Sequence, residues 1–449
     1  MAGIFKAYDI RGIYGQTLTE AVAEEIGRAF VAFLKARRVA VGMDMRPHSQ
    51  PLFDALARGL TSQGCTVIRL GLCSTPISYF ANGYLGVDGS IMITASHNPG
   101  EWNGFKLCRE LAIPISGATG IQEIERIVAA KAWPPPASTP GTVTAWDALP
   151  EYVRHVQGRI RPSKRLRIVA DFANAMGIQE ARCFDGLLDV DPLFDTLDGT
   201  FPNHEANPLK PETLDALRRK IQTGPYAFGV AFDGDADRVG FVDERGEIVP
   251  MDLMTALIAQ SVLQTQKGRI LYDLRSSHAV PEVIRESGGE PIMSRVGHAF
   301  IKQQMRDQGA LFAGELSGHY YFRDNYFTES SAMAVLAVAE LVARSGRPLS
   351  ELVRPLRRYF ASGEINLEVE HPQEVLAAVK RRFSDGRLFE LDGVTVEYDS
   401  WWFNIRVSNT EPLVRLNLEA RSRDEMERRR DEVLAFLRAA GRGREANPG

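Results

Sequence analysis

The fold of this chain is constrained most strongly by a strand–helix pattern that recurs along the sequence and ends each time in a polar loop. In the first block, apolar runs at residues 39–41, 66–70 and 90–93 are separated by helical stretches, and the third run leads into the polar residues 94–99. Strands that alternate with helices predict a mainly parallel sheet. Ligands bind outside the carboxyl ends of strands in such sheets, so we expect chemistry in this loop.

Two later blocks repeat the pattern. Their expected strands are residues 166–170, 227–232, 270–272, 292–294 and 311–313. The strand at 227–232 ends in DGDADR, and the strand at 311–313 ends in GELSGH. We expect the next helix to begin near Glu329. Each block therefore places a polar loop after a buried strand.

The last part of the chain has a different pattern. Its expected strands are residues 365–369, 394–398, 402–407 and 414–419, and its expected helices are 373–383 and 424–437. These elements predict an α+β module. A proline-rich segment at 130–140 reads as a linker, because prolines keep a chain extended. The expected domains are residues 1–145, 146–249 and 250–361, all α/β, and the α+β domain 362–449.

One helix start is visible in the sequence. Thr17 and Glu20 have the spacing of a capping box, which predicts that a helix begins there. The apolar residues that follow share one helical face, at positions 22, 26, 30, 33 and 34.

Composition and charge exclude several classes of protein. A length of 449 residues predicts more than one domain, and a net charge of −4 lacks the basic excess of nucleic-acid binders. A few arginines in one cleft can still attract a small anion. No run approaches the roughly 18 apolar residues of a membrane span, and the first residues lack a signal peptide's apolar core. We expect a cytoplasmic protein with no membrane partner.

Cysteines add no metal site. The chain contains Cys65, Cys73, Cys108 and Cys183, and no two of them form a CxxC pair. A zinc ribbon therefore has no support, and we expect four free thiols.

Three aspartates at alternate positions form the most specific chemical signal. Alternate side chains of an extended segment point the same way, so Asp233, Asp235 and Asp237 can converge on one ion. Carboxylate oxygens suit Mg²⁺ or Ca²⁺. An EF-hand is excluded because Arg238 stands where its loop needs glycine, and because a strand precedes the loop. The alternative is a solvated acidic turn.

The loop 94–99 offers a nucleophile. Ser96 follows a strand end, and phosphorylation would give it a charge of about −1.5 to −2 that a neighbouring cation can offset. Lys106 lies nearby in sequence and can serve a proton or phosphate transfer. An ordinary Ser-Asn-Pro turn is the alternative.

Two further loops carry binding groups. Glu315, Ser317 and His319 alternate, and each can hydrogen-bond a sugar hydroxyl, although a satisfied turn at a helix start explains them equally well. A cluster of donors follows near the C-terminus, where arginine can bind phosphate through two hydrogen bonds. Its members are Arg406, Ser408, Asn409, Thr410 and Arg415. A solvated basic strand end is the alternative.

The four loops together resemble the α-D-phosphohexomutase family. The motifs TASHNP, DGDADR, GELSGH and SNTEP stand in family order over nearly the whole chain, and FKAYDIRG resembles the family's first segment. The resemblance implies four domains around one central cleft, with one loop from each. It implies that Ser96 is the phosphoserine, and that Ser96, Asp233, Asp235 and Asp237 hold one Mg²⁺.

The resemblance also assigns binding roles. Glu315, Ser317 and His319 would bind sugar hydroxyls, while Arg406, Ser408, Asn409 and Thr410 would hold the phosphate that does not react. Arg238 would neutralise the transferred phosphoryl group. Lys106 and His298 are candidates for proton transfer, with their individual roles open. The remaining substrate-binding candidates are Tyr8, Arg11, Arg275, Gly297 and Arg415.

The motifs narrow the subfamily. Phosphoglucosamine mutases usually carry SGTEP and GEQSGH, whereas this chain has Asn409 and Leu316, so it is more similar to phosphomannomutase and the bifunctional phosphomannomutase/phosphoglucomutase. The family often has lysine where Arg275 stands, and arginine keeps the charge but does not readily exchange a proton. Ala236 replaces a commoner glycine.

The expected reaction interconverts hexose 1-phosphate and hexose 6-phosphate, of mannose and/or glucose. A hexose 1,6-bisphosphate would be intermediate and activator, and the fourth domain would rotate while it turns. Alternatives are a phosphoglucosamine mutase, a magnesium-dependent sugar phosphatase using the same phosphoserine, and a non-catalytic sugar-phosphate binder. We expect a monomer or homodimer.

Overall fold

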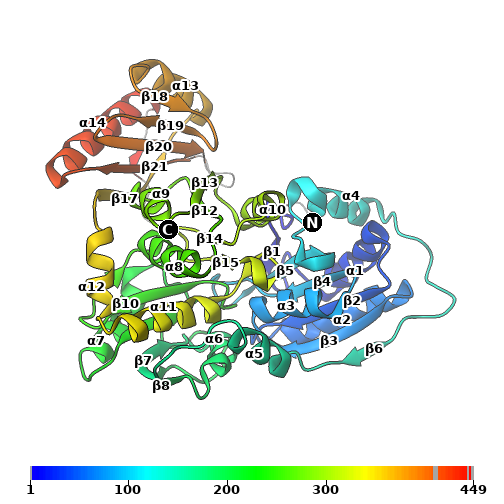
Figure 1. Ribbon diagram of the computed structural model, residues 1–449. Coiled ribbons are helices and arrows are strands. Elements are labelled where there is room, and N and C mark those ends of the chain that lie inside the picture. Colours follow the sequence, from blue (N-terminus) through cyan, green and yellow to red (C-terminus); the bar gives the residue numbers. More distant parts are fainter. Residues whose placement is uncertain (1–2, 408–412, 442–443, 446–449) are drawn as a thin grey trace.

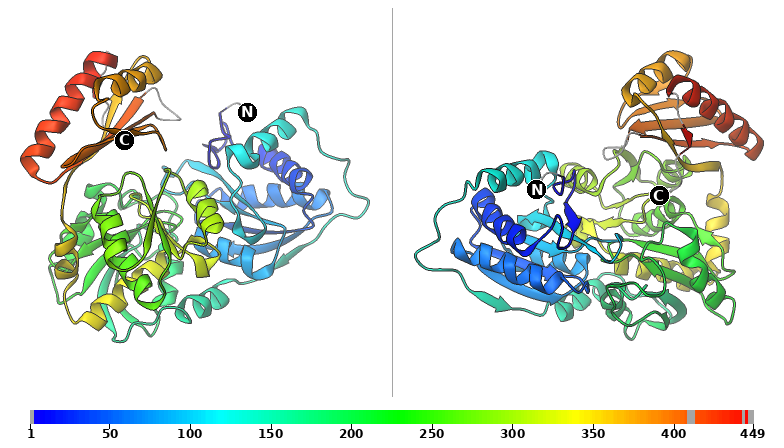
Figure 2. Two further views of the ribbon diagram at one scale, coloured as in Figure 1. Left: turned by 45° about the horizontal axis from the view of Figure 1, so that its top comes forward. Right: turned by 180° about the vertical axis from the view of Figure 1, so that it is seen from behind.

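The protein consists of four sheets, each built from a successive part of the chain (Figure 1). This computed structural model describes residues 3–407, 413–441 and 444–445. Helices cover the sheets of the first three domains, and the fourth domain forms a separate lobe beside the third (Figures 1 and 2). Within the described residues, no helix combines the length and apolarity that crossing a membrane requires.

The first domain holds a six-stranded mixed sheet in the order β1-β5-β4-β2-β3-β6. Its strands are β1 (Ile10–Ile13), β2 (Arg38–Met43), β3 (Thr66–Leu72), β4 (Gly89–Ile93), β5 (Trp102–Arg109) and β6 (Val143–Ala145). Its α-helices are α1 (Glu20–Leu34), α2 (Ser49–Ser62), α3 (Thr75–Leu85) and α4 (Gln122–Ala130). Strands β4, β2, β3 and β6 run parallel, while β1 and β5 are antiparallel to their neighbours.

The second domain has five strands in the order β11-β10-β9-β7-β8. They are β7 (Leu166–Asp171), β8 (Leu188–Leu193), β9 (Phe228–Phe232), β10 (Val239–Asp243) and β11 (Ile248–Val249). The helices are α5 (Leu149–Gln157), α6 (Gly177–Glu180) and α7 (Asp215–Ile221). Strand β9 is buried along its whole length and leads into the DGDADR loop.

The third domain also has five strands, in the order β13-β12-β14-β15-β16. They are β12 (Arg269–Asp273), β13 (Glu290–Ser294), β14 (Phe312–Gly314), β15 (Tyr320–Phe322) and β16 (Thr328–Glu329). The helices are α8 (Met251–Thr265), α9 (Ala279–Glu286), α10 (His298–Gln308), α11 (Ser331–Ser345) and α12 (Leu349–Val353).

The fourth domain has an antiparallel sheet in the order β18-β19-β20-β21-β17-β22. Its strands are β17 (Phe360–Glu368), β18 (Arg387–Phe389), β19 (Val394–Glu397), β20 (Trp401–Val407), β21 (Leu413–Ala420) and β22 (Arg444–Glu445). Helices α13 (Pro372–Arg382) and α14 (Arg423–Gly441) pack on this sheet. The mixed α/β sheets and the α+β last domain confirm the predicted fold class.

The clusters of buried apolar side chains do not follow the division of the molecule into four sheets. One cluster of buried side chains runs through the first three domains and includes Phe80, Phe232 and Leu336. A separate cluster, with Phe403 and Leu416, fills the fourth domain. The first three domains therefore share apolar packing, whereas the fourth has a core of its own.

One local prediction needs correction, and one strand was not predicted. The N-cap of α1 is Thr19, whose hydroxyl accepts a hydrogen bond from the Val22 amide, so Thr17 does not form the predicted capping box. The Thr17 hydroxyl instead accepts from the Ile13 amide in the preceding turn. The segment after the predicted linker also forms an edge strand, because residues Val143–Ala145 pair in parallel with β3.

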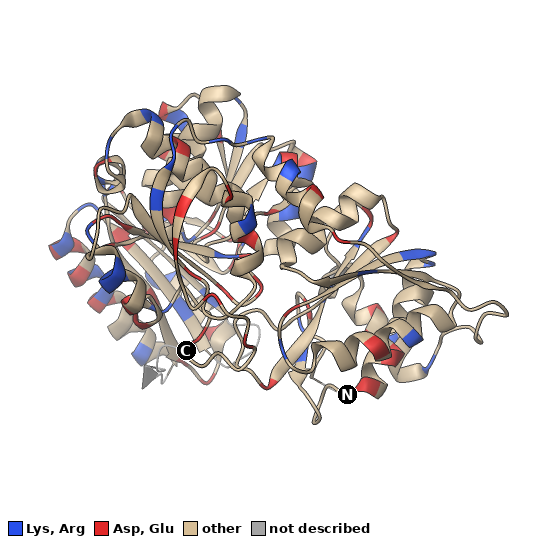
Figure 3. Ribbon diagram, turned by 90° about the horizontal axis from the view of Figure 1, so that it is seen from below, with Lys and Arg blue, Asp and Glu red and all other residues tan. Residues whose placement is uncertain are grey.

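Charge is distributed in both signs over the molecule. Lysine and arginine occur together with aspartate and glutamate on many of the elements seen from below (Figure 3). This distribution accords with the small net charge of −4.

Candidate active site

Ser96 stands in the loop that follows β4, at the carboxyl end of the strand. It adopts a left-handed backbone conformation with φ of +53°, which is uncommon for a residue other than glycine. The Ser96 amide donates to the Thr94 hydroxyl over 2.9 Å, which helps to hold this turn. Such strain is found where surrounding contacts fix a functional residue.

The loop is held by Arg46, a buried residue that the sequence analysis missed. Its guanidinium donates to four loop carbonyl oxygens and to Asp44, which lies 3.1 Å away. The four carbonyls belong to Ser96, Asn98, Pro99 and Trp102, at distances of 2.6 to 3.0 Å. Arg46 lies in the segment after β2, which ends at Met43, so the rule that polar residues after apolar strands carry function would have found it.

The three aspartates lie together beside Ser96. Asp233, Asp235 and Asp237 are buried, and one carboxylate oxygen from each lies within 4.8 Å of the others. The Ser96 Oγ donates to Asp233 Oδ2 over 2.8 Å. The structure therefore brings together all four residues predicted to hold the metal.

The chemistry of this group fits a divalent cation. Within the described part of the chain, Asp235 Oδ1 is buried without a hydrogen-bond partner, and the neighbours of Asp237 Oδ1 are the cationic groups His319 Nε2 at 3.3 Å and Arg238 Nε at 4.0 Å. Burial, and then the neighbouring Asp235 and Asp237 carboxylates, raise the pKa of Asp233 to about 8. An oxygen-only ligand set of this kind suits Mg²⁺, whose charge would relieve the repulsion.

Lys106 partly balances these carboxylates. Its ammonium lies 2.5 Å from both Asp235 Oδ2 and Asp237 Oδ2. Burial acts to lower the pKa of Lys106, but the two aspartates raise it above its usual value. Thr75 at the start of α3 also contacts the loop, because its hydroxyl donates to Asp235 Oδ2 over 2.6 Å. Sequence reasoning missed Thr75, which lies far from any motif.

The serine loop and the aspartate loop touch backbone to backbone at Gly234. A Cβ placed on Gly234 would stand 2.2 Å from the Ser96 carbonyl oxygen, which is closer than any side chain tolerates. Glycine is therefore required here for the two loops to meet.

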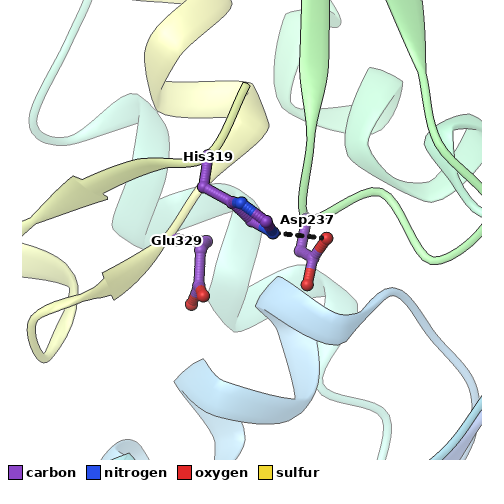
Figure 4. Close-up of side chains that lie close together, drawn as sticks. All are labelled: Asp237, His319 and Glu329. Carbon is purple, nitrogen blue, oxygen red and sulfur yellow. Dashed lines mark ion pairs between the residues drawn. The ribbon is translucent and has the colours of Figure 1, made fainter. Parts of the chain in front are cut away.

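The predicted sugar-binding loop lies next to the metal loop through His319. Its Nε2 is 3.3 Å from Asp237 Oδ1, an ion pair that Figure 4 marks with a dashed line. Its Nδ1 lies 2.8 Å from the Ser317 hydroxyl and 3.2 Å from Glu315 Oε2. Although burial opposes the change, Asp237 and Glu315 raise the pKa of His319 to about 9. The imidazolium therefore joins the two loops.

Glu315 is engaged on both oxygens. It accepts from the Gly297 amide over 3.1 Å and from the Tyr321 hydroxyl. Burial would raise the pKa of Glu315, but His319 and Arg275 hold it below its usual value. The contact with Gly297 brings residues 296–298 to the edge of the loop.

His298 begins α10 close to His319, with their ring centres 6.4 Å apart. Burial, followed by the charges of Lys302 and Lys106, holds the pKa of His298 well below its usual value. Its Nδ1 lies 3.9 Å from Glu329, which pairs with the buried Lys302 over 2.8 Å. Sequence reasoning missed this Lys302–Glu329 pair.

The N-terminal candidates lie on two sides of the site. Arg11 donates to the Ala95 carbonyl over 3.3 Å and pairs with Asp9 over 2.7 Å. It thus contacts the serine loop. Tyr8 packs against His298, with ring centres 5.5 Å apart.

Arg238 contacts both neighbouring loops. Its Nε lies 3.8 Å from Asp233 Oδ2 and 3.4 Å from His319 Nε2. Arg238 therefore lies between the aspartate loop and the predicted sugar-binding loop.

The remaining cationic candidates form a second group. Arg275 pairs with Asp273 over 2.7 Å, while Arg406 and Arg415 stand on β20 and β21. Asp273 also accepts from the Leu316 amide over 2.9 Å, which connects this group to the predicted sugar-binding loop. The candidates Ser408, Asn409 and Thr410 lie outside the described residues.

Comparisons with known proteins cover all four domains. The chain matches the phosphoglucomutase/phosphomannomutase alpha/beta/alpha domains I, II and III at residues 2–134, 150–246 and 250–359. It matches the family's C-terminal domain at residues 364–436.

Relatives align over nearly their full length. The chain is 41% identical to a phosphomannomutase of Escherichia coli over 93% of this chain and 94% of that protein. It is 39% identical to a phosphomannomutase of Methanocaldococcus jannaschii over 97% of both chains. A crystal structure of a phosphoglucomutase/phosphomannomutase family protein from Burkholderia thailandensis superposes with a TM-score of 0.91, at 34% identity over 97% of both chains.

These matches run in order along the chain, and they accord with the motif order and with the contacts between the serine, aspartate and GELSGH loops. The chain belongs to the phosphoglucomutase/phosphomannomutase family and is an isomerase of that type.

Proposed function

We propose that the protein interconverts hexose 1-phosphate and hexose 6-phosphate, of mannose and/or glucose, through phospho-Ser96 and a hexose 1,6-bisphosphate. The observation that carries this proposal is the 2.8 Å hydrogen bond between Ser96 Oγ and Asp233 in the buried aspartate group. Several relatives are named phosphomannomutase, which supports the mannose phosphates as substrates.

Asp233, Asp235, Asp237 and a phosphate on Ser96 would hold one Mg²⁺. The bound ion would neutralise negative charge on the phosphoryl group, which is the main requirement of phosphoryl transfer. Arg238 would add a second positive charge, because its Nε lies 3.8 Å from Asp233.

The first step transfers the phosphoryl group from Ser96 to the substrate. The bond between phosphorus and Ser96 Oγ breaks while a bond forms to O6 or O1 of the hexose monophosphate. The hydroxyl proton passes to a base while an acid protonates the departing Ser96 Oγ, and the product is the bisphosphate. After the bisphosphate has turned, the Ser96 hydroxyl gives up its proton and takes the other phosphoryl group, and the departing sugar oxygen takes up a proton.

Two residues are candidates for these proton transfers. His298 Nδ1 is buried without a hydrogen-bond partner among the described residues, so it is available to a substrate hydroxyl. The Lys106 ammonium lies 2.5 Å from Asp235 Oδ2 in the aspartate group. Burial holds the pKa of His298 well below its usual value, and the aspartates raise the pKa of Lys106 against the effect of burial, so these shifts favour neither order and the acid and base roles are open between the two residues.

The rest of the site would hold the sugar. Glu315, Ser317 and His319 offer hydrogen-bonding groups in one loop, and the arginines of the third and fourth domains would bind the phosphate that does not react. The 1-phosphate and the 6-phosphate would occupy this position in turn.

A coupled assay tests the substrate class. Mannose 1-phosphate, glucose 1-phosphate and glucosamine 1-phosphate are compared, each with a trace of the matching bisphosphate, while inorganic phosphate is measured in parallel. We expect isomerisation of mannose or glucose phosphate. Preference for glucosamine phosphate would indicate a phosphoglucosamine mutase, and phosphate release without isomerisation would indicate a phosphatase.

The phosphoserine is tested separately with Ser96→Ala. Because the acceptor oxygen is lost, we expect turnover to fall by at least about 10³-fold, the scale of losing a covalent nucleophile. Ser90→Ala, at a buried serine on the preceding strand, is the matched control. Near-normal turnover of Ser96→Ala would refute the covalent route.

A further inference from the structure

Glu364 is a carboxylate on which three arginines from two domains converge. Its Oε2 lies 2.5 Å from Arg406 and 3.8 Å from Arg275, and its Oε1 lies 3.6 Å from Arg415. We call Glu364, Arg275, Arg406 and Arg415 the joint cluster, because Glu364 lies in the middle of β17, the first strand of the fourth domain, and pairs with Arg275 of the third domain. No sequence motif includes Glu364.

A bulge in β17 places this carboxylate. Ala361 pairs with Glu419 and Glu364 pairs with Asn417, so β17 has one more residue than β21 between these pairs. Gly363 adopts a φ of +72°, which glycine reaches without strain. Bulges of this kind change the direction of a side chain, and here the residue after the bulge is Glu364.

The arginines need a negative partner. Arg406 and Arg415 are directly opposite each other on β20 and β21, an arrangement of like charges that destabilises a sheet. Burial, and then the charge of Arg275, lower the pKa of Arg406, whereas Glu364 acts to raise it. Glu364 is thus the contact that offsets repulsion across the joint.

The cluster retains capacity for an anion. The Nε atoms of Arg406 and Arg415 are buried without a hydrogen-bond partner among the described residues. Three guanidinium groups face the two carboxylates of Glu364 and Asp273, which leaves one positive charge in excess. The Arg415 side chain is 30% exposed, so an anion can reach the cluster from solvent.

We propose that Glu364 is a positioning residue that keeps the three arginines gathered across the joint of the third and fourth domains, ready for the phosphate of the substrate. This inference rests on the proposed function, because it takes these arginines as the phosphate site. On binding, the phosphate oxygens take over hydrogen bonds from Arg406, while Glu364 stays paired with Arg275.

The same contacts would link the phosphate to the sugar. Arg275 pairs with Asp273, and Asp273 accepts from the Leu316 amide in the predicted sugar-binding loop. Glu364 therefore completes a series of polar contacts. The series runs from the Leu316 amide through Asp273 and Arg275 to Glu364 and Arg406. The His278–Glu419 and Val296–Asp392 hydrogen bonds also join the third and fourth domains, but Glu364 is the contact that acts on the arginines themselves.

The test compares Glu364→Gln with three other variants. Losing the charge leaves the arginines to repel each other, so we expect the KM for hexose 1-phosphate to rise about tenfold with kcat changed less than about twofold, as for lost uniform binding. Inhibition by inorganic phosphate should weaken in parallel. Glu364→Asp should restore part of the affinity, and Glu368→Gln, an exposed glutamate on the same strand, should behave as the unaltered protein.

Arg406→Ala separates this inference from the function on which it rests. If Arg406→Ala raises KM but Glu364→Gln leaves it unchanged or lowers it, the positioning role is refuted and the phosphate site stands. If Arg406→Ala leaves KM unchanged, the phosphate site itself is refuted, and this inference with it. A loss of kcat in Glu364→Gln together with a lower melting temperature would show a purely structural role and also refute the proposal.

Discussion

The serine–aspartate region and the joint cluster are built in opposite ways. Ser96 and the aspartates are buried, and Arg46, Thr75 and Lys106 hold their loops through short hydrogen bonds and ion pairs. The joint cluster is partly exposed. Its Arg406–Glu364 pair of 2.5 Å lies within the fourth domain, and the pair that joins Arg275 of the third domain to Glu364 is longer, at 3.8 Å, between domains with separate apolar cores. The difference indicates that the residues around the nucleophile are held in fixed positions, whereas the phosphate-binding arginines of the fourth domain can shift relative to them.

Apart from Ser96→Ala, the largest expected effect on activity comes from a change in the serine–aspartate region. Asp235→Asn removes one charge from the aspartate group, so we expect the Mg²⁺ concentration needed for half-maximal turnover to rise roughly 100-fold, at the upper end of the cost of losing a group that supports a metal site. The measurement is turnover against Mg²⁺ concentration. Asp215→Asn on the surface helix α7 serves as the control. Full activity of Asp235→Asn in excess chelator would contradict the metal site.

A smaller loss is expected from the support of the serine loop. Arg46→Lys keeps the charge but not the planar fork that reaches four carbonyl oxygens, so Ser96 should shift from its position. We expect kcat to fall roughly 10- to 100-fold, the effect of misplacing a reacting atom by about 1 Å. Arg58→Lys, at an exposed arginine of α2, should leave kcat unchanged. An unaltered kcat in Arg46→Lys would show that the loop holds its shape without the fork.

The smallest expected effect concerns stability in the shared core. Glu180 is fully buried between the first three domains, where it accepts from Ser74 and Tyr152, and burial raises its pKa to about 7. The unfolded value is about 4.3, so the folded protein binds the proton more tightly. This contribution is present below pH 4.3 and is lost as the pH rises through about 7.

Replacing this carboxyl isolates its contribution. Glu180→Gln has no proton to lose, so the stability of this variant relative to the unaltered protein should increase between pH 4.3 and 7, by about 1 to 3 kcal/mol. Urea unfolding at a series of pH values measures this difference. A difference that does not change with pH would place the pKa of Glu180 near its ordinary value.

Much of the fold could be predicted because it depends on local pattern. The strands at 90–93 and 228–232 are buried on all residues, and apart from Ser90 they are made of apolar residues and glycine, which is the run that the sequence shows. Strand β6 could not be predicted, because its three residues are exposed and gain their structure only by pairing with β3. The cap of α1 was misplaced by two residues because Thr17 and Thr19 offer the same hydroxyl.

Among the site residues too, some could be predicted from local sequence pattern and others could not. The aspartates and Ser96 are adjacent to buried strands, so sequence pattern was enough to single them out. Arg46, Thr75 and Glu364 act through partners 50, 160 and 42 positions away, and no local spacing reveals such contacts. The motif resemblance supplied roles for residues such as His319 that spacing alone left open.

The absence of a side chain at Gly234 affects how the domains can move relative to one another. Since its backbone rests directly on the carbonyl of Ser96, the first two domains cannot open or close against each other without parting the nucleophile from its carboxylates. The third domain shares an apolar core with the first two, so we expect any swing that admits a sugar or lets it turn round to occur where the chain enters β17. The close approach that glycine permits would then keep the nucleophile and its carboxylates together during such a swing.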